Sequence, residues 1–114
     1  MAGLVHQFLE TSAGVYPDKT ALLDGELEAT YSEIDSLANR LARLLTLHGL
    51  QKGDRVLMIM ENSLKSVVGY YGVLKAGGAV VPLDVSYPHA RIHLMIERAK
   101  PFRVISDIAE VRAL

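Results

Sequence analysis

The segment Val73–Asp84, VLKAGGAVVPLD, combines the end of a helix, a tight turn and the start of a strand. Lys75 stands in a last helical turn, where a cation suits the helix dipole, and Gly77 can adopt the positive φ of a helix C-cap. The uncharged run Ala79–Leu83 then predicts a strand covered on both faces. Pro82 cannot donate a ladder hydrogen bond, so it belongs at the end of that strand.

The flanking segments repeat this alternation of helix and strand. Val56–Met60 is a charge-free run typical of a strand, and Phe102–Ser106 predicts a further strand. Between them, Ser86–Pro88 is expected to start another helix, with Pro88 suited to its first position. The order from Val56 onward is β-α-β-α-β, which favours parallel pairing. We therefore expect an α/β fold with an incomplete doubly wound, mostly parallel sheet and helices on its faces. The last residues, Ile108–Leu114, could begin one more helix.

The N-terminal part predicts a helix over 3–14 and then a small antiparallel element. Thr20–Leu23 and Leu27–Tyr31 read as two strands joined by the turn pair Asp24-Gly25. Thr30 and Glu33 have the spacing of a capping box, which predicts that a helix begins there.

Two helices carry apolar stripes. The first is expected to end at Gly49, and its stripe comprises Ile34, Leu37, Ala38, Leu41, Ala42, Leu44 and Leu45. The second is expected to be capped by Asn62 or Ser63, and its stripe comprises Leu64, Val67, Val68, Tyr71 and Leu74. Gly69 and Gly72 lie within this second helix and weaken it, so we expect close packing at both positions.

Composition excludes several classes of function. Twelve basic and thirteen acidic residues are interspersed, which indicates neither nucleic acid nor an anionic membrane as a partner. Cysteine is absent, which excludes disulfides and thiolate metal sites and fits a cytoplasmic location. Half of the 114 residues are hydrophobic and nine more are glycine, a high share for so small a domain. Part of this apolar surface is therefore expected to face a partner.

No constellation predicts an active site, so we assign no catalytic, cofactor-binding or metal-binding residue. Gly77-Gly78 lie between a helix and a strand, the reverse of a phosphate-binding loop. His89, His93 and Glu97 share one helical face and are interpreted as a solvated surface, with a metal site as the alternative. Ser63, Ser66 and Ser86 lack the turn of a nucleophile elbow.

Two carboxylates and two tyrosines are the remaining candidates. Glu61 and Asp84 each follow a predicted parallel strand, at the edge where open α/β sheets bind their ligands. Capping or turn roles are the alternative reading for both. Tyr70-Tyr71 is interpreted as one ring at the rim and one in the core.

Several motifs resemble the adenylation domains of nonribosomal peptide synthetases, which are adenylate-forming, AMP-binding enzymes. Leu74–Asp84 resembles the family motif LKAGxAYVPID, with Val80 in place of Tyr and Leu83 in place of Ile. Ala29–Ile34 resembles the LTYxEL motif and departs from it at both ends. The family's GD-V and YP-x-x-R-I patterns are matched by Gly53-Asp54-Arg55-Val56 and by Tyr87-Pro88 with Arg91-Ile92. The resemblance covers nearly the whole chain.

The resemblance implies an enzyme that uses ATP and Mg²⁺ to convert an amino or other carboxylic acid into an acyl-adenylate. The acyl group then passes to a phosphopantetheine thiol on a carrier protein. Residues 1–114 would be the N-terminal portion of this domain, while the phosphate loop, the substrate pocket and the C-terminal lobe lie elsewhere. The matched motifs are scaffold motifs, so no functional residue or cofactor is carried over to this chain.

We therefore expect an inactive structural portion of an adenylation enzyme, either an excised segment or one half of a split enzyme. Its partners would be the rest of the domain and, for the complete enzyme, the carrier protein. The alternative from another class is a binding or scaffold module that kept the sheet and lost the chemistry. An unrelated flavodoxin-like domain is disfavoured because its ligand loops are not visible. The acid substrate and the oligomeric state are not encoded in any motif that we find.

Overall fold

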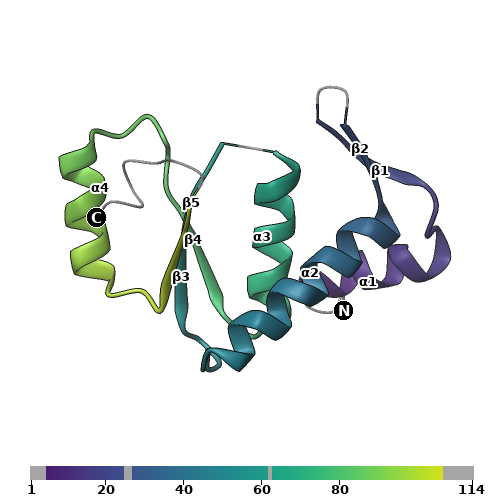
Figure 1. Cartoon of the computed structure of the whole chain (residues 1–114), viewed down its shortest axis with the longest axis horizontal. Helices are drawn as coiled ribbons and strands as arrows, with labels where there is room; N and C mark the ends of the chain where they lie inside the picture. The colour runs from purple at the N-terminus through teal and green to yellow at the C-terminus, as the bar shows by residue number, and fades with distance from the viewer. Residues whose placement is uncertain (1–4, 25–26, 62, 107–114) are drawn as a thin grey trace.

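The computed structural model describes residues 5–24, 27–61 and 63–106 (Figure 1). The elements follow in the order α1 (Val5–Val15), β1 (Thr20–Asp24), β2 (Leu27–Thr30), α2 (Tyr31–Leu47), β3 (Arg55–Ile59), α3 (Leu64–Lys75), β4 (Ala79–Pro82), α4 (His89–Ala99) and β5 (Arg103–Ser106). This order confirms the predicted alternation. The predicted helix at Ile108–Leu114 lies outside the described residues.

The central sheet has three parallel strands in the order β4-β3-β5. Helix α4 covers one side of this sheet, and α3 with α2 lies on the other (Figure 1). Two apolar clusters account for the layers: Ile59 packs with Ile92 of α4, while Val56 packs with Val73 of α3. The predicted doubly wound, parallel α/β arrangement is therefore confirmed.

The prediction that Ala79–Leu83 is covered on both faces is wrong. Strand β4 lies at the edge of the sheet, so its ends are exposed and Val80 and Val81 are only half-buried. The central position belongs to β3, whose last four residues are all buried. An apolar run indicates a strand but does not say where in the sheet that strand lies.

The N-terminal elements form as predicted. Strands β1 and β2 pair antiparallel, although Gly25 of the predicted turn lies outside the described residues. The N–H of Glu33 donates to Thr30 Oγ1, and the N–H of Thr30 donates to Glu33 Oε1, each at 3.1 Å. This capping box begins α2, and Gly49, with a φ of +99°, follows its C-cap residue His48.

The apolar stripe of α2 is narrower than predicted. Ile34, Ala38 and Leu45 are buried, whereas Leu37 is 39% exposed and Leu44 is 52% exposed. At 3.6 residues per turn, these two leucines fall on one flank of the stripe. Helix α3 covers the middle of the stripe and leaves this flank in solvent.

Helix α3 begins at a second capping box. The N–H of Ser66 donates to Ser63 Oγ at 3.2 Å, and the N–H of Ser63 donates to Ser66 Oγ at 2.8 Å. Ser63 is therefore the cap. The stripe predicted for this helix, Leu64, Val67, Val68, Tyr71 and Leu74, is only half-buried; the fully buried positions are Gly69, Gly72 and Val73.

The two helical glycines make the close approaches that we expected. A Cβ at Gly72 would lie 2.6 Å from Leu41 Cδ2 and 2.9 Å from Leu41 Cβ. The backbone of α3 at Gly72 therefore packs directly against the Leu41 side chain of α2, close to its Cβ. A Cβ at Gly69 would lie 2.6 Å from Cε of Met58, the free end of a flexible side chain. Gly72 thus sets the distance between α2 and α3, while Gly69 makes room for Met58 of β3.

Gly72→Ala is expected to lower the free energy of unfolding by about 1–2 kcal/mol, because overpacking outweighs the gain of about 1 kcal/mol in helix propensity. Gly69→Ala is the matched control: Met58 can rotate away, so its net change should be close to zero. Urea denaturation of the variants measures both values. Equal destabilisation by the two substitutions would contradict the role given to Gly72.

The turn after α3 has the predicted conformation. Gly77 has a φ of +89°, and the N–H of Gly78 donates to the Val73 carbonyl at 3.0 Å. The Gly77 carbonyl accepts from the N–H of Gly53 at 2.9 Å, which fastens this turn to the one preceding β3. These contacts confirm that Gly77-Gly78 forms a helix C-cap and turn.

Lys75 does more than complement the helix dipole. Its side chain is 6% exposed, and its Nζ lies 2.7 Å from Glu10 Oε1 and 2.8 Å from Asp35 Oδ1. One cation therefore ties α1, α2 and α3 together. Burial lowers the pKa of Lys75, but its contacts with Asp35 and Glu10 outweigh that effect and raise the pKa above its ordinary value of 10.5.

Candidate functional site

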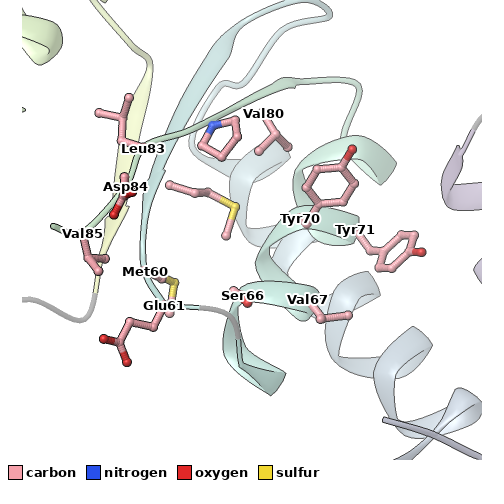
Figure 2. Close-up of a pocket in the computed structure, with 12 residues that line it drawn as sticks. Met60, Glu61, Ser66, Val67, Tyr70, Tyr71, Val80, Leu83, Asp84 and Val85 are labelled. Carbon is pink, nitrogen blue, oxygen red and sulfur yellow. The ribbon is translucent and has the colours of Figure 1, made fainter. Parts of the chain in front are cut away.

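A groove of about 720 Å³ opens at the carboxyl ends of β3 and β4, beside α3 (Figure 2). We call it the β3–β4 groove. Its apolar lining comprises Met58, Met60, Val67, Val80, Leu83 and Val85. Its polar lining comprises Glu61, Ser66, Tyr70, Tyr71 and Asp84, and Pro82 of β4 completes it.

The topology explains why residues from distant parts of the sequence meet here. Parallel strands end at the same edge of a sheet, so the segments that follow β3 and β4 lie side by side. The first brings Met60 and Glu61, and the second brings Leu83 and Asp84. The structure thus places both candidate carboxylates at one groove, as the order of elements predicts.

Asp84 has a defined local role. Its Oδ1 accepts a hydrogen bond from the N–H of Ser86 at 2.8 Å, which holds the turn ahead of α4. This backbone hydrogen bond lowers the pKa of Asp84, so the carboxyl group is ionised at neutral pH. Asp84 therefore both stabilises this turn and lines the groove. Glu61 is exposed, so its carboxylate is accessible to a partner.

The two tyrosines form the opposite wall of the groove (Figure 2). Their rings meet edge to face, with centroids 5.8 Å apart and planes at 87°. Tyr71 packs against the buried cluster of Ile34 and Ala38, while Tyr70 is 40% exposed. The rim position predicted for Tyr70 is confirmed, whereas Tyr71 is half-buried and packs against the core without being fully inside it. The sequence does not predict that Tyr70 faces a groove, because the other side of that groove is formed by β3, β4 and the residues that follow them.

The remaining candidates do not join this site as reacting groups. Ser63 and Ser66 cap α3, although Ser66 also reaches the groove. His93 Nε2 lies 3.1 Å from Glu97 Oε1 on the exposed face of α4. Within residues 5–24, 27–61 and 63–106, no group of three or more His, Cys, Asp or Glu side chains could hold a metal ion.

A second cleft, of about 660 Å³, lies between α1, α2 and α3. Its lining includes Lys75 and Glu10, which already pair with each other, and Arg43 and Thr46 of α2. This arrangement joins three helices and is structural. In the part of the chain that the structure describes, no helix is both long enough and apolar enough to cross a membrane.

Comparison with known proteins identifies the family. The family model of AMP-binding enzymes matches residues 9–113. The chain belongs to the AMP-binding enzyme family. Tyrocidine synthase 3 of Brevibacillus parabrevis is 41% identical over 103 residues, which cover 90% of this chain and 2% of that protein. Surfactin synthase subunit 2 of Bacillus subtilis (strain 168) is 45% identical over 93 residues, covering 82% of this chain and 3% of that protein.

Solved structures of this family share the fold. The nonribosomal peptide synthetase FmoA3 superposes with a TM-score of 0.90 at 30% identity, covering 99% of this chain and 12% of that one. The N-terminal subdomain of Klebsiella oxytoca NpsA superposes with a TM-score of 0.84 at 26% identity, covering 95% of this chain and 28% of that one. The resemblance to the N-terminal part of an adenylation domain is therefore confirmed. The chain spans a small fraction of the relatives that it matches.

Proposed function

We propose that this AMP-binding family chain is the structural N-terminal portion, residues 1–114, of an adenylation domain. The complete domain would use ATP and Mg²⁺ to convert an amino or other carboxylic acid into an acyl-adenylate, and would load the acyl group onto a carrier-protein phosphopantetheine thiol. Two solved relatives support this chemistry by their ligands: FmoA3 holds α-methyl-L-serine-AMP, and the NpsA N-terminal subdomain holds 3-hydroxyanthranilyl-AMSN.

One observation carries the proposal: the family match spans nearly the whole chain, yet the groove at the ligand edge of its sheet does not suit a nucleotide. The groove presents the carboxylates of Glu61 and Asp84, and no Lys or Arg occurs among the described residues that line it. Carboxylates repel a triphosphate. Gly77-Gly78 offers no alternative, because it caps the C-terminus of α3, where the dipole also repels anions.

ATP, Mg²⁺ and the acid substrate are therefore expected to bind residues outside this chain, and this chain alone is expected to be inactive. Its role would be to complete the N-terminal lobe around the parallel sheet. The carrier protein would engage the assembled enzyme. A cytoplasmic location is part of this proposal and rests on the absence of cysteine and on ATP as a substrate.

Complementation tests the proposal. The chain is mixed with a separately produced remainder of an adenylation domain, and amino-acid-dependent pyrophosphate exchange is measured for each part alone and for the mixture. We expect exchange in the mixture only. A Leu57→Asp chain, which places a charge in the buried central strand, is the control and should not complement.

Two outcomes would contradict the proposal. Exchange by this chain alone would show that the chemistry resides in these residues. Silence in every mixture, with a folded monomeric chain, would favour the binding or scaffold module.

A further inference from the structure

Among the residues that the structure describes, no strand pairs with the outer edge of β4. In the described sheet β4 pairs only with β3, through bonds such as Ala79 N–H to the Asp54 carbonyl (2.8 Å) and Leu83 N–H to the Met58 carbonyl (2.9 Å). Odd-numbered residues of β4 therefore face β3, and the main-chain groups of Val80 and Pro82 point toward the open edge. Pro82 has no N–H, so the edge offers the Val80 N–H and two carbonyl groups.

This edge and the β3–β4 groove form one continuous surface. The side chains of Val80 and Pro82 line the groove, so a strand laid along β4 would place every second side chain over it. The apolar lining contributed by Met58 and Val67 suits apolar side chains at those positions. The surface therefore fits an extended peptide segment better than a helix or a small planar ligand.

The charge of the groove specifies the occupant further. Glu61 and Asp84 lie on the side of the groove away from the tyrosines, and both carboxylates are exposed (Figure 2). No cation among the described lining residues neutralises them. The exposed ring of Tyr70 on the opposite wall offers an aromatic face, which also attracts cations. The surface thus favours a segment with a Lys or Arg and disfavours an acidic one.

We propose that the β3–β4 groove and the open edge of β4 together bind an extended segment of the rest of the adenylation domain, in which a Lys or Arg stands between apolar side chains. This inference rests on the proposed function and names the chemistry of the partner segment. A second copy of this chain is the competing occupant and is separated from it by the test below.

The test titrates the adenylation-domain remainder into chain variants and records the concentration that gives half-maximal pyrophosphate exchange. Glu61→Gln combined with Asp84→Asn removes both charges but keeps an oxygen that can accept from Ser86 N–H. We expect this double variant to raise the half-saturating concentration about fivefold to tenfold, as for two exposed ion pairs. Glu28→Gln with Glu97→Gln removes two exposed charges elsewhere and should change it less than twofold.

Hydrogen exchange of the Val80 amide in the assembled mixture gives a second readout, and we expect strong protection. The inference would be overturned if the mixture catalyses pyrophosphate exchange but the groove variant has an unchanged half-saturating concentration. It would equally be overturned if the Val80 amide is not protected from hydrogen exchange in that mixture. Either result would leave the proposed function standing. Dimerisation of the chain alone that depends on Glu61 and Asp84 would assign the surface to a second copy and would also overturn it.

A peptide arm tests the inference even if no mixture is active. The probes are two short peptides of alternating threonine and valine, one with a central lysine and one with a central glutamate in a groove-facing position. We expect the lysine peptide to protect the Val80 amide at a concentration at least fivefold lower than the glutamate peptide does. Equal protection by both, or none by either, would overturn the proposed recognition.

Discussion

Leu57→Ala is expected to lower the free energy of unfolding by about 3 kcal/mol, the typical cost of emptying a leucine site in a core. Leu57 lies in β3 between two neighbouring strands, and its exposed fraction is 0%. Its side chain is on the same face as Ile59, which packs against Ile92 of α4. With helices on both faces of the sheet, the strand cannot move to refill the space.

Urea denaturation followed by circular dichroism measures this loss. Leu44→Ala is the matched control, because the same substitution at a half-exposed position of α2 should change the free energy by less than about 0.5 kcal/mol. Similar losses for the two variants would mean that β3 is not the centre of the packed sheet. A wild-type chain without a cooperative transition would equally contradict the predicted core.

Lys75→Met is expected to cost about 2 kcal/mol, because it keeps the apolar stem but leaves two carboxylates without their shared cation. Both carboxylates retain some contact with solvent, which keeps the loss below the 3–5 kcal/mol of a fully buried pair. Lys65→Met on the same helix is the control: Lys65 is exposed, so its removal should cost less than about 0.5 kcal/mol. Equal costs would show that the ion pairs do not join the helices.

Lys75 also makes the stability of the fold depend on pH in the alkaline range. The pKa of Lys75 is higher in the folded chain than its ordinary value of 10.5, so folding favours the charged form. This contribution is complete below pH 10.5 and is lost as the pH rises through the folded-state pKa. The stability difference between the wild type and Lys75→Met should therefore be constant near neutral pH and shrink above pH 10.5. A difference that is unchanged at pH 11.5 would contradict this linkage.

Local signals predicted most of the elements. The capping box of Thr30 and Glu33 and the glycine C-cap at Gly77 depend on residues only a few positions apart, so the sequence alone contains the interaction. The glycines of α3 are a stronger case. Gly69 and Gly72 cost helical stability, which predicts close packing at both positions, and the structure places Met58 against Gly69 and Leu41 against Gly72.

The candidate site was predictable in part. Parallel strands end at one edge of a sheet, and strand direction follows from the order of elements, so the sequence predicts that Glu61 and Asp84 lie at the same edge. The wall opposite them was not predictable. Tyr70 and Val67 enter the groove only because α3 lies at a particular distance and rotation beside β3 and β4.

Alone, the sequence determined the elements, the parallel sheet and the family, since periodicity, caps and motifs are local along the chain. Only the tertiary structure placed β3 at the centre and β4 at the edge, turned Leu37 and Leu44 to solvent, and gave Lys75 its two partners. These features depend on which surfaces meet across many residues of sequence. An apolar residue contributes to the same sequence periodicity whether it contacts a helix or water. Its burial therefore depends on how the helices and the sheet pack together.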